Sequence, residues 1–141
     1  MKNKFLIDSD VSLDALKNKK IAIIGYGNQG RAQALNLKDS KLDVVVGLRD
    51  NSESKEKVHR ENLTYKTIKQ AVLDCDIISI LISDKHIAST WKEFIFPNLR
   101  ANQTVLFSHG YNVHYKLIDI PKNINVIMVA PSGGGNLVRN E

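Results

Sequence analysis

The sequence has little cysteine and proline, few aromatic residues and no long apolar run. Its single cysteine, Cys75, excludes an internal disulfide among the 141 residues. Because Cys75 directly precedes an apolar stretch, we expect it to be a small buried side chain. No apolar run approaches the ~20 residues of a membrane span, and Phe5–Ile7 is too short for a secretion signal. We therefore expect a cytoplasmic protein with no membrane partner.

Acidic residues are the minority among the charges. The sequence has 20 Lys and Arg against 15 Asp and Glu, a net charge of +5. Apart from Lys17–Lys20 the basic residues are scattered among acidic ones, and the aromatic residues form no basic-aromatic repeat with them. This distribution is typical of a solvated surface and argues against a nucleic-acid partner. A content of 43% hydrophobic residues fits one folded domain over residues 1–141.

Short apolar runs alternate with helical patterns along the whole chain, which predicts an α/β fold with a doubly wound, mostly parallel sheet. The expected strands are Ile21–Ile24, Asp43–Leu48, Leu63–Tyr65, Ile77–Ile82, Val105–Phe107 and Val126–Val129. The expected helices are Leu13–Leu16 (capped by Ser12), Gln29–Leu37, Glu53–Arg60, Lys66–Leu73, Lys85–Ile95 and Val113–Ile118. Because the strands are almost entirely apolar, we expect both faces of the sheet to be covered.

The first apolar run leads directly into Gly25, Gly27 and Gly30, a Gly-x-Gly-x-x-Gly pattern. A strand precedes it, a helical pattern follows it, and a second strand closes a βαβ unit, which is typical of a Rossmann-like dinucleotide-binding domain. The helix start near Asn28 and Gln29 would offer free N–H groups to a diphosphate. The alternative is a glycine-rich turn that binds nothing.

Arg49 follows the second strand, where such a fold senses the adenosine ribose. An arginine there, with Ser52 and Ser54 at a helix start, favours the 2′-phosphate of NADP over the free hydroxyl of NAD. Asp50 and Glu53 would have to point away from that phosphate. The alternative is a surface arginine beside a helix-capping serine.

His109 and Gly110 follow the fifth predicted strand, at the edge of the sheet where a nicotinamide would lie. An imidazole that titrates near neutrality can transfer a proton during hydride transfer. A histidine in such a turn can equally be structural. The other histidines show no metal-ligand spacing with it, so we predict no metal site.

Four segments resemble the amino-terminal domain of ketol-acid reductoisomerase, an NADP-dependent oxidoreductase of valine, leucine and isoleucine biosynthesis. They are Ile-Gly-Tyr-Gly-Asn-Gln-Gly at 24–30, Val-Val-Val-Gly-Leu-Arg at 44–49, His-Gly-Tyr-Asn-Val-His at 109–114 and Val-Ile-Met-Val-Ala-Pro at 126–131. The resemblance implies Mg²⁺-assisted alkyl migration on a 2-hydroxy-3-keto acid such as 2-acetolactate, followed by reduction with NADPH.

The resemblance also implies a set of site residues. It implies that His109 is catalytic. The cofactor-binding residues that it implies, together with those read from the pattern, are Gly25, Tyr26, Gly27, Asn28, Gln29, Gly30, Arg49, Ser52, Ser54, Asp84, Lys85, His86, Ile87 and Gly135.

The sequence also departs from that family. The turn after the fourth strand usually reads Pro-Asp-Glu-x-Gln but is Ser-Asp-Lys-His-Ile here, and Ser132 replaces a functional lysine. The resemblance predicts that the sheet is truncated after its sixth strand. It also predicts that the helical carboxyl-terminal domain with the Mg²⁺ ligands is absent, and that the chain alone is inactive. A homo-oligomer or a helical-domain partner would then cover the open edge. The alternative is a stand-alone NADP-binding module that acts as a sensor or binds a partner.

Overall fold

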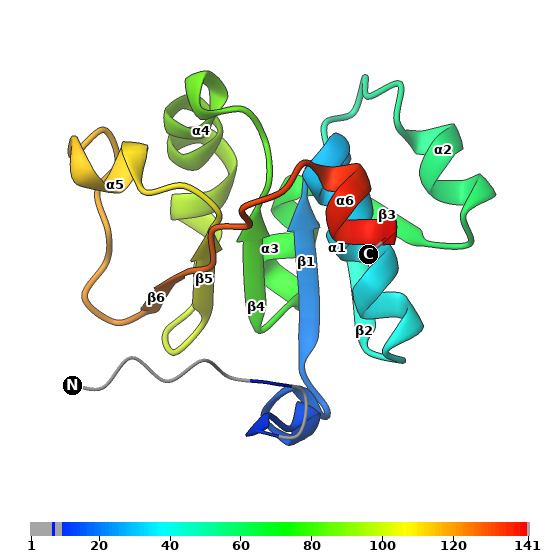
Figure 1. Cartoon of the computed structure of the whole chain (residues 1–141). Coiled ribbons are helices and arrows are strands. Elements are labelled where there is room, and N and C mark those ends of the chain that lie inside the picture. The colour runs from blue at the N-terminus through cyan, green and yellow to red at the C-terminus, as the bar shows by residue number, and fades with distance from the viewer. Residues whose placement is uncertain (1–6, 8–9, 141) are drawn as a thin grey trace.

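The core of the molecule is a sheet of six parallel strands in the order β3-β2-β1-β4-β5-β6 (Figure 1). A computed structural model describes residue 7 and residues 10–140. The strands are β1 (Lys20–Ile24), β2 (Asp43–Leu48), β3 (Thr64–Thr67), β4 (Ile77–Ile80), β5 (Thr104–Phe107) and β6 (Asn125–Met128). The strand order reverses between β1 and β4, so the doubly wound sheet is confirmed and its ligand crevice is expected there.

Helices lie on both faces of the sheet (Figure 1). They are α1 (Asn28–Asp39), α2 (Lys55–Arg60), α3 (Ile68–Asp74), α4 (Asp84–Thr90), α5 (Tyr111–His114) and α6 (Gly135–Asn140), and a 3₁₀ turn (Leu13–Leu16) precedes β1. Alternate residues of β1 face opposite sides: Ile21 and Ile23 pack with α1 and α2, whereas Ala22 and Ile24 pack with α3 and α4. Burial on both sides explains why β1 is an uninterrupted apolar run.

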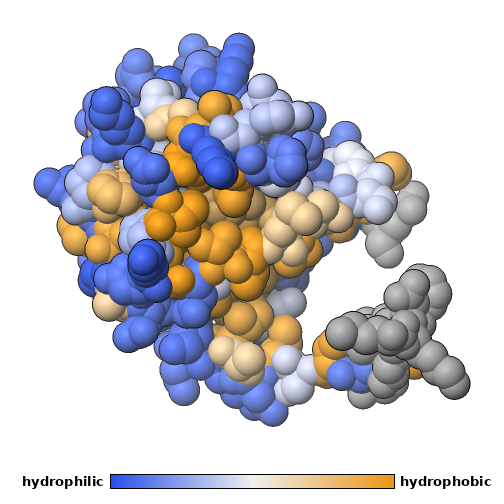
Figure 2. Space-filling view, turned by 90° about the vertical axis from the view of Figure 1, so that its left-hand side faces the viewer, coloured by the Kyte–Doolittle hydropathy of each residue, from blue (hydrophilic) through white to orange (hydrophobic). Residues whose placement is uncertain are grey.

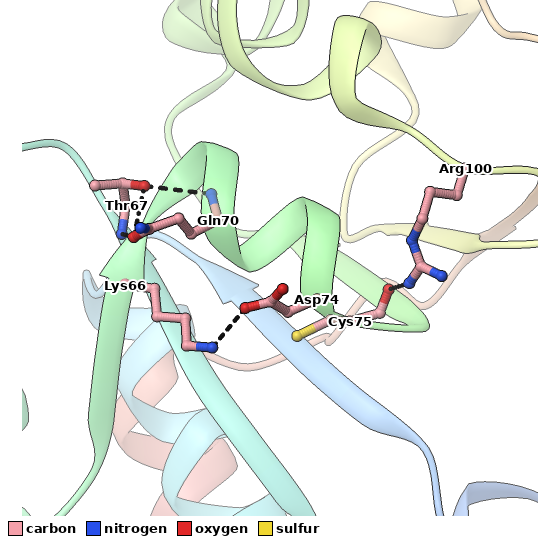
Figure 3. A network of polar contacts seen from close by, with 6 residues as sticks. All are labelled: Lys66, Thr67, Gln70, Asp74, Cys75 and Arg100. Atoms are coloured by element: carbon pink, nitrogen blue, oxygen red, sulfur yellow. Dashed lines mark hydrogen bonds and ion pairs between the residues drawn. The ribbon is translucent and has the colours of Figure 1, made fainter.

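Helix α3 begins at a capping box, seen from close by in Figure 3. The Gln70 amide donates to Thr67 Oγ1 at 3.2 Å, and the Thr67 amide donates to Gln70 Oε1 at 3.4 Å. After the helix, Arg100 donates to the Cys75 carbonyl at 2.9 Å. These bonds satisfy main-chain groups that a helix leaves open at its two ends. Cys75 is buried, as expected, and burial raises the pKa of its thiol to about 11.

Several expected boundaries were wrong. Lys66 belongs to β3, because Thr67 caps α3 and fixes its start. The helix expected over Lys85–Ile95 starts one residue earlier as α4 and changes to a π-helical turn at Trp91. A 3₁₀ turn containing Pro97 follows, since a proline cannot continue the α-helical hydrogen bonding. Helix α5 ends early because Lys116 takes a left-handed conformation, with φ of 54°.

The expectation that all strands are covered on both faces was wrong for the two edge strands, β3 and β6. All four residues of β6 are exposed, and Met128 is 61% exposed. Figure 2 views this side of the molecule and shows a broad apolar area bordered by polar residues. An edge strand has a neighbour on one side only, and α1 and α6 lie over the opposite half of the sheet (Figure 1).

Candidate cofactor-binding site

The glycine turn between β1 and α1 needs glycine at two positions for different reasons. Gly25 has a φ of +97°, and a Cβ there would lie 2.7 Å from Ile82 Cγ2. At Gly30 a Cβ would overlap the carbonyl group of Gly25, so glycine lets α1 pack directly on the turn. Gly27 has no neighbour within 4 Å of such a Cβ, so its main chain borders open space. The turn therefore presents bare backbone at the carboxyl end of β1.

One half of a crevice opens beside this turn, with a volume of about 270 Å³. Seven of its lining residues come from the glycine turn, the end of β2 and the loop that leads into α2, and an eighth is His86 of α4. These are Gly25, Tyr26, Gly47, Leu48, Arg49, Ser52, Ser54 and His86. The structure thus brings the glycine turn together with the three residues expected at a 2′-phosphate. Asp50 and Glu53 are not among its lining residues, in line with the expectation that they point away.

The loop from Arg49 to Ser54 is braced by its own hydrogen bonds. The Ser52 amide donates to the Arg49 carbonyl at 3.0 Å, and the Ser54 amide donates to Ser52 Oγ at 3.3 Å. Ser54 precedes α2 but makes no side-chain cap there. The Arg49 side chain is exposed. The hydroxyl groups of Ser52 and Ser54 can therefore donate hydrogen bonds to a ligand, and the exposed guanidinium of Arg49 is accessible to it.

The wall opposite this loop comes from residues that the sequence pattern did not single out. They are Ser89 and Thr90 of α4, and Glu93 and Phe94 of the π-helical turn. Phe94 is only partly buried and packs against the core cluster. A signal existed in the spacing, since residues 86, 89, 90, 93 and 94 share one face of a helix. The expected helix over Lys85–Ile95 contains all five positions, but the pattern alone does not say which face of that helix borders a crevice.

The other half of the crevice has a volume of about 360 Å³ and lies between β1, β4 and β5. Six of the expected site residues line it: Gly27, Asn28, Gln29, Asp84, Ile87 and His109. Gly30, Lys85 and Gly135 line neither half. The crevice as a whole follows the carboxyl ends of the strands, where doubly wound sheets bind ligands.

His109 lies at the mouth of this second half. Its Nδ1 is 3.6 Å from Asp84 Oδ2, and the Tyr111 amide donates to the same nitrogen at 3.3 Å. The His109 and Asp84 side chains are 66% and 45% exposed. With Nδ1 accepting this hydrogen bond, the neutral ring carries its proton on Nε2. His109 thus places an imidazole, a side-chain type that serves in general acid–base catalysis, at the crevice.

Two buried oxygen atoms near His109 have no hydrogen-bond partner among the described residues: Ser108 Oγ and Asn112 Oδ1. Asn112 is 1% exposed, and its Nδ2 donates to the Asp84 carbonyl at 3.2 Å, so it holds α5 against the start of α4. Leaving a buried oxygen without a donor is costly. Neither residue was among the site residues expected from the sequence, although Ser108 directly precedes His109 and Asn112 lies two residues after Gly110.

Helix α6 was not expected from the sequence, and it packs against α1. A Cβ at Gly135 would overlap the Asn28 carbonyl group, so glycine allows the two helix starts to meet. Gln29 Nε2 donates to the Gly133 carbonyl at 2.9 Å, and Asn36 Nδ2 donates to the Val138 carbonyl at 2.9 Å. Gly135 does not line the crevice itself. It contacts the backbone of Asn28, which does line the crevice.

Among the described residues, no group of three or more His, Cys, Asp or Glu side chains is placed to hold a metal ion. In that same part of the chain, no helix combines the length and apolar character needed to cross a membrane.

The model of the acetohydroxy acid isomeroreductase NADPH-binding domain matches residues 15–141. The chain belongs to this family. It is 49% identical over 138 residues to the ketol-acid reductoisomerase (NADP(+)) of Pyrobaculum calidifontis, and 50% identical over 136 residues to that of Methanocaldococcus jannaschii. A solved structure of an NADH-preferring ketol-acid reductoisomerase from an uncultured archaeon superposes with a TM-score of 0.90 at 36% identity. The family assignment confirms the resemblance seen in the four sequence segments.

The matches cover nearly all of this chain but less than half of each relative. The shares are 98% of this chain and 42% of the Pyrobaculum protein, 96% and 41% for the Methanocaldococcus protein, and 96% and 42% for the solved structure. The shared part is the NADPH-binding domain of the family. One of these relatives prefers NADH, so membership alone does not fix which nucleotide this domain selects.

Proposed function

We propose that this chain binds NADPH in the crevice and supplies the nucleotide half of a ketol-acid reductoisomerase reaction. The observation that carries the proposal is the joint lining of one half of the crevice by the glycine turn, Arg49, Ser52 and Ser54. Bound NADPH would supply the hydride. The substrate class that follows from the family is a 2-hydroxy-3-keto acid such as 2-acetolactate, in branched-chain amino-acid biosynthesis.

Each part of the crevice has a separate task in this proposal. The bare backbone at Gly27 and the free amides at the start of α1 face the diphosphate, while Arg49 and the two serines face the 2′-phosphate. His109 lies in the other half of the crevice with the Asp84 carboxylate 3.6 Å away, and it would hold or move the proton that accompanies reduction. Ser108, which lines this half beside His109, has a hydroxyl oxygen without a hydrogen-bond partner among the described residues.

The Mg²⁺ ion of the family's reaction has no evident place among the described residues. Mg²⁺ needs several oxygen ligands in octahedral geometry, and no cluster of carboxylates provides them there. We assign no step to the ion in this chain. We expect the chain by itself to bind NADPH without converting 2-acetolactate, and Mg²⁺-dependent conversion by the purified chain would contradict this.

Nucleotide binding is tested by titrating the chain with NADPH and NADH, using calorimetry on the wild type, Arg49→Asp and Arg60→Asp. Arg60 is a matched control, because its side chain is 76% exposed on α2 and the same charge is reversed. Charge-assisted hydrogen bonds contribute about 1.5–3 kcal/mol each, so we expect NADPH to bind about 10–100 times more tightly than NADH. Arg49→Asp should abolish this preference, whereas Arg60→Asp should leave most of it.

Two results would overturn the proposal. Wild-type protein that binds neither nucleotide would remove the cofactor assignment. Equal losses of NADPH affinity in Arg49→Asp and Arg60→Asp would show that only the overall charge of the protein matters. Arg49 would then not form a specific site for the 2′-phosphate.

A further inference from the structure

A carboxylate outside the crevice, Glu61, joins two of the segments from which the crevice is built. The Tyr26 hydroxyl donates to Glu61 Oε2 at 2.6 Å, and Arg31 Nε donates to Glu61 Oε1 at 2.7 Å. Tyr26 lies in the glycine turn, and Arg31 lies in the first turn of α1. Glu61 follows the last residue of α2, the helix that begins directly after the loop of Arg49–Ser54. One side chain therefore connects elements that are 30 and 35 residues apart in the sequence.

Helix α2 has few other attachments to the rest of the molecule. Among its six residues, all of them described, Val58 alone is buried. Its Arg60–Glu56 ion pair is exposed, at 3.9 Å, and stays within the helix. At the end of the helix, Lys38 of α1 donates to the Glu61 carbonyl at 2.7 Å. Polar contacts at Glu61 thus hold the end of α2 against α1 and the glycine turn.

The charges around this carboxylate are balanced. Its side chain is 20% exposed, and that of Arg31 is 34% exposed. Burial raises the pKa of Glu61, but hydrogen bonds from Arg31 and Tyr26 outweigh this effect and the net pKa is lowered. Burial and the bond to Glu61 raise the pKa of Tyr26, so its hydroxyl remains a donor. Near neutral pH the ionised Glu61 and Arg31 and the neutral Tyr26 therefore form one hydrogen-bonded network.

We propose that Glu61 is a positioning residue for the dinucleotide, fixing the spacing between the glycine turn and the loop of Arg49–Ser54. This inference rests on the proposed function, in which the turn takes the diphosphate and the loop takes the 2′-phosphate. A ligand that spans both segments binds more tightly when they are held in place beforehand, because it does not have to order them. Glu61 lines neither half of the crevice, so it acts through Tyr26, Arg31 and α2.

The effect should depend on the length of the ligand. The loop keeps its local shape through bonds between the Ser52 amide and the Arg49 carbonyl, and between the Ser54 amide and Ser52 Oγ. Adenosine 2′-monophosphate would use this loop but would not reach the diphosphate-binding amides. Loss of Glu61 should therefore weaken the binding of NADPH much more than the binding of the short ligand. A general loss of stability would not discriminate between them in this way.

The test compares Glu61→Ala and Glu61→Gln with Glu56→Ala, an exposed carboxylate on the same helix. Calorimetry gives the dissociation constants for NADPH and adenosine 2′-monophosphate, and a urea titration without ligand confirms that each variant is folded. We expect Glu61→Ala to weaken NADPH about 10-fold or more, and the short ligand by less than about 3-fold. Glu61→Gln should be intermediate, because its amide oxygen still accepts from Tyr26. Glu56→Ala should match the wild type.

Equal losses for the two ligands, or no loss for either, would overturn the inference while leaving the proposed function in place. A wild-type chain that binds neither ligand would instead overturn the proposed function itself. If Glu61→Ala does not fold, Glu61→Gln provides the test, since this variant keeps the size of the side chain. The quantity compared is then the ratio of its dissociation constants for NADPH and adenosine 2′-monophosphate. A ratio equal to that of the wild type would then refute the positioning role.

Discussion

The contact between Gly135 and Asn28 allows a sharp prediction about how α6 supports the crevice. An alanine Cβ at 135 would overlap the Asn28 carbonyl, a main-chain group that cannot rotate away. Overpacking of this kind costs about 1–3 kcal/mol. At Gly134 the same Cβ has no neighbour within 4 Å, and φ lies outside the left-handed region. Both Gly135→Ala and Gly134→Ala reduce the flexibility of the unfolded chain, but only Gly135→Ala introduces a clash. Gly134→Ala is therefore the control for Gly135→Ala.

The cost must be compared with what holds α6 in place. Four polar contacts tie α6 and the segment before it to α1: Gln29 to the Gly133 carbonyl, Asn36 to the Val138 carbonyl, and Arg139 to Asn36 and to Asp39, the last two at 2.7 Å. At a net of about 1 kcal/mol each they sum to about 4 kcal/mol. A clash of about 1–3 kcal/mol removes a large part of this, so α6 should open about 10–100 times more often.

Hydrogen exchange measures this opening directly. The Val138 amide donates to the Gly134 carbonyl at 3.1 Å, so its exchange rate reports on whether α6 is formed. We expect about 10–100-fold faster exchange at Val138 in Gly135→Ala, with Gly134→Ala within about 2-fold of the wild type. NADPH should also bind about 10-fold more weakly to Gly135→Ala, because Asn28 lines the crevice. Equal exchange rates in the two variants would refute the reasoning.

Two further predictions follow from groups whose pKa is shifted. With the pKa of Cys75 raised to about 11 by burial, its thiol should resist alkylation at pH 8 in the native protein and react readily in urea; rapid native reaction would contradict the assigned burial. The pKa of Glu61 is lowered below its ordinary value of 4.5, so its stabilising contribution is complete above that pH and is lost as the pH falls further. Urea titrations should therefore show the stability difference between wild type and Glu61→Gln narrowing below pH 4.5, and a constant difference would contradict the network.

The sheet and the glycine turn could be predicted because their signals are local. Each central strand is a short apolar run, and the polar or glycine residues that follow it mark the carboxyl edge where the crevice lies. The same local signals do not predict which strands lie at the edges of the sheet. Asn125–Met128 is as apolar as a central strand, yet it is exposed, because its position at the edge depends on strand order. A run of residues specifies a strand but not its neighbours.

Helix α6 illustrates a second limit. Its six residues are too few for a helical pattern to be distinguished from a loop, and isolated helices of that length are unstable in water. It forms where Gly135 meets Asn28 and where Arg139 reaches Asp39, contacts that span about a hundred residues of sequence. The resemblance to the family still pointed to Gly135, although for contact with the cofactor. The structure adds a physical reason for glycine there, which is the close approach of two backbones.

Tyr26 shows how a correct motif can leave a side chain unexplained. Its place between two glycines marked it for the diphosphate turn, and it does border the crevice. Its hydroxyl, however, is directed to Glu61 at 2.6 Å, and the residue is only 5% exposed. A diphosphate in this turn would therefore meet the main chain of residues 26–29, while the phenol holds the turn from behind. A partner 35 residues away in the sequence cannot be read from the motif, which explains why the glycine pattern identifies the turn but not what supports it.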